Sequence, residues 1–331
     1  MLWRGGAVPM KLSIVIPTWN GLALLKACLE SLRAQTWRDF EIVVSDDGST
    51  DGTAAQLAEH YPEVIVMRSE RNMGFVAAAN RGIGRSRGAW VFLLNNDVTL
   101  AEDCLARLMA AAEQGDAAML APLVLWTEDP RLVYSAGDRI GVNGRPVSIG
   151  YRREQGTFTL AEHPFGVSGG YGLFRRDLLD TIGVLDPAFG AYFEDADLCF
   201  RARWAGFEAR LVPEALAWHV GSASISGRLW WRTRQCHRNH ALLVIKNFSL
   251  RLLYWNAAAL LEERRHQNRR LFQVARSEWG TVRAMGFVIA ACFDLAAKIP
   301  GALVQRRRIL KHRTLGDRAI QSLLMNGEGD A

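Results

Sequence analysis

The chain has 331 residues, of which 49% are hydrophobic and 22% are charged. This composition is typical of a folded globular protein and excludes a chain that is mainly disordered, collagen-like or held together by disulfides, and the length allows one large domain with an appendage or two domains. The net charge of +6 hides a split, because residues 1–227 contain 21 basic and 27 acidic residues whereas residues 228–331 contain 19 basic and 7 acidic ones. An acidic body is therefore followed by a strongly basic last third.

The cysteines and the apolar stretches predict a cytosolic protein. Five widely spaced cysteines without a CxxC pair indicate reduced, mostly buried thiols. The N-terminus lacks the apolar stretch of a signal peptide, and residues 1–10 are expected to be a disordered extension unless Met10 is the true start. No run reaches the roughly 20 apolar residues of a membrane span. The best candidate, residues 285–293, stops at Asp294, so we expect no spanning helix.

The first hundred residues alternate short apolar runs with segments of helical periodicity. We predict strands at residues 12–16, 40–44, 64–67 and 90–94, and helices at residues 22–32, 51–60 and 75–86. This alternation predicts parallel strands joined by crossover helices that cover both faces of the sheet. After residue 125 the pattern loosens, and glycines are frequent in residues 137–172. A helix at residues 194–205, a strand at 209–212 and helices from Arg228 onward complete the prediction.

Polar residues follow three of these strands. They are Pro17-Thr18-Trp19-Asn20-Gly21, Asp46-Asp47-Gly48-Ser49 and Asn95-Asn96-Asp97. Ligands of parallel sheets bind beyond the carboxyl ends of the strands, and carboxylates with carboxamides suit a divalent cation and the hydroxyls of a nucleotide. Each stretch alone is also explained by turn chemistry, but gathered at one sheet edge they favour a binding site.

A dinucleotide site is the obvious competitor. The nearest glycine fingerprint, Gly82-Ile83-Gly84-Arg85-Ser86-Arg87, follows a helix and precedes a strand, which reverses the required order. We expect it to cap a helix instead. The chain has no Walker phosphate loop either.

Six stretches between residues 11 and 224 resemble family 2 glycosyltransferases of the GT-A fold. They are SIVIPTWNG, FEIVVSDDGSTDGT, RNMGFVAAANRGI, WVFLLNNDV, GGYGLFRRDLLDTIGVLDPAFGAYFEDADLCFRARWAGF and VPEALAWHVGSAS. The NND and EDxDLCxR forms are most similar to rhamnosyltransferase-like members that act on bacterial surface polysaccharides. The resemblance implies an α/β fold of GT-A type, with a mostly parallel central sheet, helices on both faces and a C-terminal helical segment. The implied catalytic domain spans residues 11–227, with a nucleotide-binding half at 11–125 and an acceptor half at 126–227.

The resemblance also implies residue roles. Asp97 would bind Mg²⁺ or Mn²⁺ in a motif whose first position is asparagine here, a neutral ligand that weakens charge pairing with the metal. His219 would complete the metal site, although a hydrogen-bonded structural histidine explains it equally well. Asp195 matches the general base, although an acidic first turn of a helix is the alternative. The nucleotide and donor sugar would contact Pro17, Thr18, Trp19, Asn20, Asp46, Asp47, Gly74, Ala78, Asn80, Asn95 and Asn96, and the acceptor side would include Glu194, Gly169 and Gly170.

Two further arginines have two interpretations each. Arg201 and Arg203 follow the acidic residues of the predicted helix at 194–205. They either meet phosphate or lie on a solvated helix face.

Residues 228–331 form a basic amphipathic helical segment in this prediction. Val288, Ala291, Leu295, Ile299 and Ala302 keep helical spacing, and three arginines follow at 306–308. Basic residues beside an apolar face suit a helix on anionic lipid, and a helical cap on the catalytic domain is the alternative. We find no nucleic-acid-binding module. The chain also lacks the QxxRW signature of processive synthases, so we expect transfer of one or a few sugars.

The sequence therefore predicts an inverting, metal-assisted transferase. It would move a sugar, with rhamnose favoured by the resemblance, from a nucleotide-diphosphate donor to a glycan or lipid-linked glycan. We expect it to be cytoplasmic and peripheral at the inner face of the cell membrane. A sugar-nucleotide nucleotidyltransferase and an inactive glycan-binding or scaffold protein of the same fold are the alternatives. The base, the linkage and the oligomeric state do not follow from the residues.

Overall fold

The computed structural model describes residues 11–160, 163–221 and 229–325. The strands are β1 (Leu12–Thr18), β2 (Phe40–Asp46), β3 (Ile65–Arg68), β4 (Trp90–Leu94), β5 (Val98–Leu100), β6 (Met119–Trp126), β7 (Val133–Ser135), β8 (Asp138–Ile140), β9 (Pro146–Ser148), β10 (Tyr171–Arg175) and β11 (Ala209–His219). The helices are α1 (Leu22–Arg33), α2 (Thr53–His60), α3 (Phe75–Arg85), α4 (Cys104–Gln114), α5 (Arg176–Ile182), α6 (Glu194–Trp204), α7 (Leu229–Asn247), α8 (Leu250–Trp255), α9 (Ala257–Trp279), α10 (Thr281–Lys311) and α11 (Asp317–Leu323).

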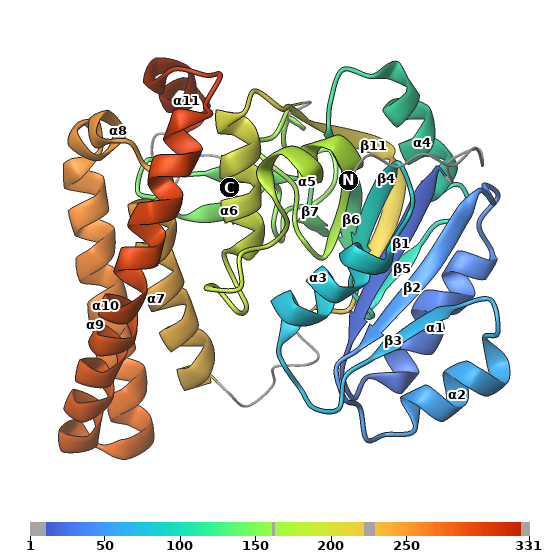
Figure 1. The fold of residues 1–331 in the computed structure, drawn as a ribbon, viewed down its shortest axis with the longest axis horizontal. Coiled ribbons are helices and arrows are strands. Elements are labelled where there is room, and N and C mark those ends of the chain that lie inside the picture. The colour runs from blue at the N-terminus through green and yellow to red at the C-terminus, as the bar shows by residue number, and fades with distance from the viewer. Residues whose placement is uncertain (1–10, 161–162, 222–228, 326–331) are drawn as a thin grey trace.

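A nine-stranded sheet forms the centre of the molecule (Figure 1). Its order is β3-β2-β1-β4-β10-β6-β11-β5, and β7 pairs with β6. The pairs β1–β2, β1–β4, β2–β3 and β6–β11 are parallel, which confirms the predicted mostly parallel sheet. Strand β10 is antiparallel to both β4 and β6, and it joins the two parallel parts. Nothing in the glycine-rich stretch before β10 predicted this insertion.

Helices cover both faces of the sheet, as predicted. One core lies between the sheet and α1, α2 and α4, and it includes Leu29 and Leu105. The other lies between the sheet and α3, α5 and α6. This second core continues into the C-terminal helices, because Leu242 and Leu243 of α7 belong to it.

The predicted elements of the first hundred residues are confirmed within about two residues at their ends. The glycine fingerprint forms the last turn of α3, as expected of a helix end. Its first glycine has a packing reason, since a Cβ atom at Gly82 would collide with the Val15 side chain of β1. Strand β11 is longer than predicted and continues to His219 past a register shift between Val212 and Leu216.

The last third of the chain forms a helical bundle of α7, α9 and α10, which lie side by side on one flank of the molecule (Figure 1). The apolar run ends at Asp294, but the helix does not, because α10 continues through Pro300 to Lys311 and is 31 residues long. Asp294 does not interrupt the helix because it pairs with Arg234 at 3.4 Å and Arg238 at 3.2 Å. Of the helices that the structure describes, α10 is the one long and apolar enough to cross a membrane by length and composition.

The cysteines agree with the prediction of reduced, mostly buried thiols. All five are free, with Cys28, Cys104 and Cys199 buried, Cys236 partly buried and Cys292 exposed. The predicted extension at residues 1–10 with Met10 lies outside the described residues. The predicted domain boundary at residues 227 and 228 lies outside them as well and stays a prediction.

Candidate active site

The polar stretches at the ends of β1, β2 and β4 come together. Thr18 lies opposite Asp46 in the parallel register of β1 and β2. The Asn96 side-chain amide donates to Thr18 Oγ1 at 2.9 Å, which joins the end of β4 to that of β1. Pro17 is buried within β1, whereas Trp19 is exposed. The fold thus gathers the predicted nucleotide-binding residues at one edge of the sheet.

Asn20 fastens the turn after β1 to the turn after β2. Its backbone has a positive φ of 48°, and its N–H donates to Ser49 Oγ at 2.9 Å. Its Oδ1 accepts the Thr50 N–H at 2.7 Å. The side chain therefore shapes the edge of the site.

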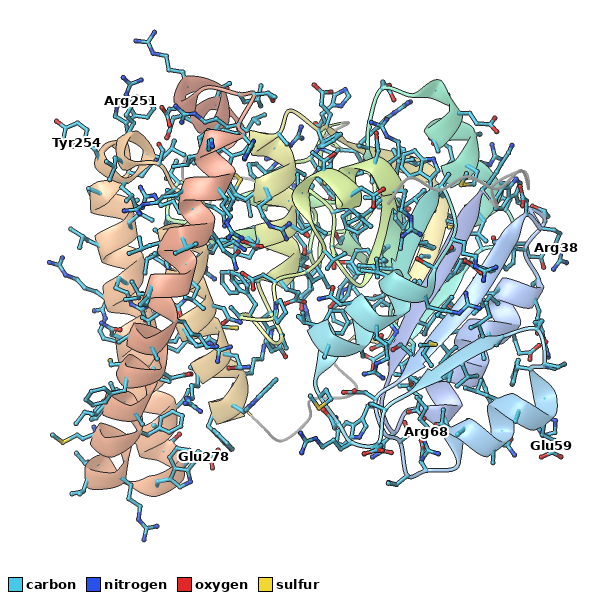
Figure 2. The ribbon with its side chains drawn as sticks, in the orientation of Figure 1. Arg38, Glu59, Arg68, Arg251, Tyr254 and Glu278 are labelled. Carbon is cyan, nitrogen blue, oxygen red and sulfur yellow. The ribbon has the colours of Figure 1, made fainter. Side chains whose placement is uncertain are left out.

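Asp46 keeps a buried oxygen without a hydrogen bond. Its side chain is fully buried, and Oδ1 accepts the Ser49 N–H at 2.9 Å. Oδ2 has no hydrogen-bond partner among the described residues, although Arg68 Nε lies 3.4 Å from it. Arg68 reaches over the end of β3 from the solvent side (Figure 2). A buried acceptor without a donor is costly, so Oδ2 suits an incoming hydroxyl or N–H group.

Asp47 uses both oxygens within the protein. Oδ2 accepts the N–H groups of Met73 and Gly74 at 2.8 and 2.7 Å. Oδ1 accepts from Arg81 at 3.1 Å and from Ser69 at 2.9 Å. These contacts hold the segment that leads into α3, so Asp47 positions this wall of the site. Its predicted contact with the nucleotide stays a prediction.

Three predicted donor-binding residues lie on α3 or at its start. The Asn80 side-chain amide donates to the Leu185 carbonyl at 2.7 Å, and Asn80 Oδ1 accepts the Leu185 N–H at 3.1 Å. Ala78 is buried. Gly74 has a φ of 91°, and the space next to its Cα is open. Asn80 therefore fastens the loop between α5 and α6 to α3, and a contact with the donor stays a prediction for all three.

Asp97 and His219 form a buried pair. Asp97 precedes β5 and His219 ends β11, and these two strands are antiparallel neighbours. His219 Nε2 lies 3.1 Å from Asp97 Oδ1, while His219 Nδ1 has no hydrogen-bond partner among the described residues. One carboxylate and one imidazole fit a divalent cation such as Mn²⁺ or Mg²⁺. Within the described ranges no third His, Cys, Asp or Glu joins them, so the ligand and water would supply the other donors.

An aromatic wall surrounds His219, and sequence reasoning missed it. The Tyr134 ring packs edge-on at 4.2 Å from the His219 ring, and Tyr171 lies 6.0 Å away. Trp126 packs on Tyr134 at 4.8 Å. Burial raises the pKa of Tyr134 to about 12, so its hydroxyl stays protonated. These residues come from short strands in and around the glycine-rich part, where no periodicity singled them out.

Asp195 lies at the start of α6 and contacts the segment before β10. Its Oδ2 accepts the Gly169 N–H at 3.2 Å, and its Oδ1 accepts the Ala196 N–H at 2.8 Å. Burial raises its pKa above the ordinary value, and these backbone N–H groups oppose that shift. The carbonyl of Gly170, the residue after Gly169, accepts a hydrogen bond from the Asn95 N–H at 2.7 Å. The glycine pair thus links Asp195 to the turn that contains Asp97.

Two other carboxyl groups accompany Asp195. Glu194 is buried with an Oε2 atom that has no partner in the described part, and burial followed by the charge of Asp195 raises its pKa well above the ordinary range. Burial and the same charge raise the pKa of Asp138 to about 7. Asp138, which the sequence did not single out, accepts from Ser148 Oγ at 2.8 Å. The raised pKa of Glu194 favours its protonated form near neutral pH, and the pKa of about 7 leaves Asp138 partly protonated there, which reduces repulsion of an ionised Asp195.

Both interpretations of Arg201 and Arg203 are wrong. Arg201 is buried, pairs with Asp197 at 2.9 Å and donates to three carbonyls of residues 182–184. Arg203 is buried as well and donates to the Phe165 carbonyl at 2.7 Å. Each guanidinium is satisfied by backbone that flanks the site, which leaves it away from phosphate and from solvent.

Helix α7 reaches the site from the C-terminal bundle. The Asn239 side-chain amide donates to the carbonyls of Phe189, Ala191 and Tyr192 at 2.9, 2.8 and 2.7 Å. The Arg232 guanidinium lies over the Tyr192 ring at 5.5 Å. The only sequence signal for these residues was the general abundance of arginine, which did not separate them from the rest of the basic third.

Comparisons with known proteins agree with this geometry. The Glycosyl transferase family 2 profile matches residues 13–183. An N-acetylglucosaminyl-diphospho-decaprenol L-rhamnosyltransferase of Mycobacterium tuberculosis is 30% identical over 236 residues, which are 63% of this chain and 75% of that protein. A PGL/p-HBAD biosynthesis glycosyltransferase of Mycobacterium bovis is 43% identical over 108 residues. That match spans 31% of this chain and 42% of the relative. An uncharacterised protein of Sinorhizobium fredii is 30% identical, and the match spans about a quarter of its length.

Solved structures share the fold. The mannosyltransferase PcManGT of Pyrobaculum calidifontis, in complex with GDP-Man and Mn²⁺, has a TM-score of 0.54 at 16% identity and matches 92% of this chain and 86% of its own. GalNAc-T7 with UDP, GalNAc and Mn²⁺ has a TM-score of 0.57 at 19% identity and matches 73% of this chain and 48% of its own. The mixed sheet, the strand-end site and the profile over residues 13–183 together show that this chain belongs to glycosyl transferase family 2 and has the GT-A fold.

Proposed function

We propose that the chain is an inverting, metal-assisted glycosyltransferase that moves a sugar from a nucleoside-diphosphate donor to an acceptor hydroxyl. The observation that carries this proposal is the link through Gly169 and Gly170, which couples Asp195 to the turn of Asp97. A carboxylate suited to a base is thus connected, through two backbone hydrogen bonds, to the turn that carries a carboxylate suited to a cation.

The nucleotide would lie over the ends of β1 and β2. The free Oδ2 of Asp46 would accept a hydrogen bond from the base or the ribose, and Trp19, Thr18 and Asn20 would border it. Asp47 and Asn80 would support this pocket through the backbone contacts that they make. The exposed Trp19 ring is available for stacking.

Asp97 and His219 would hold Mg²⁺ or Mn²⁺. The bound ion would stabilise the negative charge that develops on the departing nucleoside diphosphate. Asn95 and Asn96 are neutral, so they would contribute oxygen or amide contacts to the diphosphate region without adding charge. The two structural neighbours are complexes with Mn²⁺, which supports a divalent ion here.

Asp195 would act as the general base. The acceptor oxygen would attack the anomeric carbon from the face opposite the leaving group, and its proton would pass to the Asp195 carboxylate. The bond between the anomeric carbon and the phosphate oxygen would break with its electron pair on that oxygen. Glu194, Gly169 and Gly170 would line the acceptor side, with Gly169 keeping Asp195 in place by its N–H group.

The rhamnosyltransferase relative favours a deoxyhexose donor and a lipid-linked glycan acceptor for this chain. Such an acceptor would place the enzyme at the inner face of the cell membrane, in the synthesis of a bacterial surface polysaccharide. The basic residues of the last third are consistent with that location.

Donor turnover and a base variant test the proposal together. The purified protein would be incubated with a panel of nucleotide sugars, lipid-diphosphate acceptors and Mg²⁺ or Mn²⁺. We expect release of nucleoside diphosphate and a loss of transfer by about 10²- to 10⁴-fold in Asp195→Asn, with donor binding retained. Asp177→Asn, which changes an exposed acid of α5, is the matched control. Pyrophosphate turnover would indicate the nucleotidyltransferase instead, and a chain that binds no nucleotide would indicate the scaffold.

A further inference from the structure

Helix α10 exposes an apolar face over most of its length. Val282, Met285, Ile289 and Phe293 are 84%, 55%, 55% and 72% exposed. Between Met285 and Val304, all of them described, no exposed residue is charged. At 1.5 Å per residue this face is about 30 Å long. Monomeric soluble proteins rarely expose a continuous apolar surface of that size, so the face indicates a partner.

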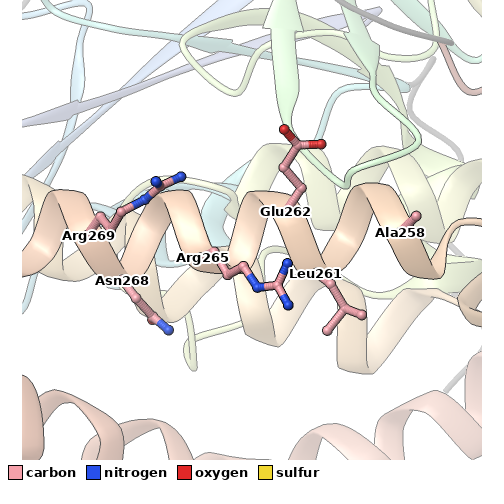
Figure 3. A pocket seen from close by; sticks show the side chains of 6 residues that line it. All are labelled: Ala258, Leu261, Glu262, Arg265, Asn268 and Arg269. Atoms are coloured by element: carbon pink, nitrogen blue, oxygen red, sulfur yellow. The ribbon is translucent and has the colours of Figure 1, made fainter.

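The neighbouring helix has a different surface. Figure 3 shows an open groove on α9 whose lining includes Glu262, Arg265, Asn268 and Arg269. Those side chains are charged or polar, as expected of a helix face in water. The long apolar face is therefore a property of α10, whereas α9 exposes the single large apolar residue Leu261 among these polar side chains.

The opposite face of α10 is tied to the bundle by polar contacts. Asp294 pairs with Arg238 at 3.2 Å and with Arg234 at 3.4 Å, both on α7. Arg306 donates to the Ile245 carbonyl at 3.4 Å. Ala284, Ala291 and Ala302 are buried against the other helices. The helix thus has one face fixed in protein and one face open.

Basic residues stand at both ends of the open face. Arg283 precedes it, and Arg307, Arg308 and Lys311 follow it, all of them exposed. Asp294 is the single acid of α10, and it points into the bundle. This distribution complements a negatively charged surface with an apolar interior.

A series of aromatic contacts runs from the first turns of α10 through α7 to the loop before α6. Trp230 of α7 packs against Trp279 at 5.3 Å and against Phe287 at 6.0 Å. Its neighbour Trp231 packs against Tyr192 at 6.1 Å, two residues before Glu194. The aromatic residues thus connect the start of the apolar face to the loop that precedes the proposed base.

We propose that α10 lies in the plane of an anionic lipid bilayer, with its outward face in the interfacial region, and does not cross it. Apolar residues on one face and cations at both ends are the properties of an interfacial helix. Crossing would require Asp294 and Lys298 to leave the bundle and enter hydrocarbon, which is costly. Pro300 removes the hydrogen bond to the Ala296 carbonyl, and at the interface water satisfies that carbonyl. The contacts of α10 carry this inference, which does not depend on sugar transfer.

Vesicle sedimentation of the whole protein, without donor or acceptor, tests the surface. The probes are phosphatidylcholine vesicles with and without about 30% phosphatidylglycerol. We expect the protein to sediment with the anionic vesicles, and Phe293→Glu to weaken the partition coefficient by about tenfold or more. Val66→Glu, which adds the same charge at an exposed apolar position of β3, is the matched control and should bind like the unchanged protein.

Cys292 allows the depth of α10 in the bilayer to be measured. This exposed thiol lies on α10 beside Phe293, so it can carry an environment-sensitive fluorophore in a Cys236→Ser background. We expect a blue shift on binding, with stronger quenching by a nitroxide near the lipid head groups than by one near the chain ends. Alkaline carbonate should release the bound protein, because an interfacial helix is not embedded in the bilayer.

Three results would overturn the proposal. Equal binding of Phe293→Glu and Val66→Glu would show that the apolar face of α10 is not the membrane contact. Resistance to carbonate with deep quenching at Cys292 would show a spanning helix. A dimer that Phe293→Glu dissociates, without vesicle binding, would show that a second copy covers the face. All three readouts are independent of turnover, so they separate this inference from the proposed enzyme activity.

Discussion

The charge state of the site depends on how its acidic side chains share protons. Asp195 accepts two backbone N–H groups, which favour its ionised form. Glu194 has a buried oxygen without a partner among the described residues, and burial raises its pKa well above the usual range. In the proposed mechanism this division would keep Asp195 available as the base while Glu194 stays neutral, a separation of roles that depends on local hydrogen bonds and not on residue type.

Replacement of Asp138 should change how stability depends on pH. Its folded-state pKa of about 7 is above the ordinary value of 3.8, so the folded protein binds a proton that the unfolded chain releases as pH rises from about 4 to 7. Asp138 therefore lowers stability as pH rises through that window. Asp138→Asn keeps an acceptor for Ser148 and cannot ionise, so its free energy of unfolding relative to the unchanged protein should rise by about 2–3 kcal/mol from pH 5 to pH 8.

Urea denaturation at both pH values measures this difference. Asp116→Asn, a change at an exposed acid on the molecular surface, should leave the pH dependence unchanged. If the free energy of unfolding changed equally with pH in Asp138→Asn and in the unchanged protein, the assigned pKa of Asp138 would be contradicted.

Removal of the carboxylate of Asp97 should weaken metal-dependent nucleotide binding. Asp97→Ala leaves His219 Nε2 without its partner and removes the charged donor of the pair. We expect the affinity for a nucleoside diphosphate in Mn²⁺ to fall by roughly 10- to 100-fold, and binding with a chelator present to stay the same. Calorimetry in Mn²⁺ and in chelator measures both. The exposed Asp39→Ala is the control, and an unchanged Mn²⁺ dependence in Asp97→Ala would exclude Asp97 as the ligand.

At the scale of elements, α7 restrains a strained loop. Tyr192 and Phe193 both have positive φ values, 67° and 70°, which cost about 1–2 kcal/mol per residue outside glycine. The three hydrogen bonds from Asn239 hold the carbonyls of this loop in place. The first turn of α6, with Glu194 and Asp195, therefore depends on a helix of the basic third.

Loss of the Asn239 amide should affect stability and turnover together. Asn239→Ala leaves three carbonyls with fewer donors, and we expect a loss of about 1–3 kcal/mol in the free energy of unfolding. The relaxed loop should also lower kcat by about tenfold, because Asp195 moves with α6. Gln273→Ala on α9 is the control, since its side chain is exposed. A normal kcat in a destabilised Asn239→Ala would restrict Asn239 to a structural role.

Regular periodicity made the first part of the sheet predictable. Most of the later strands lack such periodicity and were therefore not predicted. Residues such as Leu25 and Leu29 keep helical spacing because α1 buries one face on the sheet, so local pattern and tertiary burial agree. Tyr134 and Asp138 come from three-residue strands, which are too short for any pattern to stand out. Arg201 was misassigned because its spacing fits an exposed helix face, whereas a buried Asp197 and loop carbonyls satisfy it. The turns that carry the motifs were predicted because their chemistry is local. The residues that contact these turns from distant parts of the chain were not predicted.

At the scale of the whole molecule, the basic third and the catalytic sheet share one core. Leu242, Leu243 and Phe248 are buried in the cluster that also contains Val15 and Phe174 of the sheet. Lys246 is almost fully buried and pairs with Asp186 at 2.7 Å and with Asp197 at 2.9 Å. A buried ion pair of this kind is costly to break, because the remaining charges stay buried.

A chain that ends at residue 227 should not fold stably. It would lose the burial of Leu242, Leu243 and Phe248, worth about 1.5–3 kcal/mol each, and it would leave Asp197 without Lys246. That loss is comparable with the total stability of a typical domain. We expect no cooperative thermal transition by circular dichroism. A chain that ends at residue 325 should unfold like the unchanged protein, and a sharp transition in the shorter chain would contradict the shared core.

The place of β10 has a consequence for how the chain acquires its structure. β10 fills the gap between β4 and β6, and it comes about 80 residues after β4 in the sequence. During synthesis β4 is therefore a bare sheet edge with unpaired backbone groups until residues 171–175 have left the ribosome. Pairing over such a long sequence separation is slow. The nascent chain consequently passes through a period in which its N-terminal half is exposed to self-association, and high-concentration refolding should lose yield at this step.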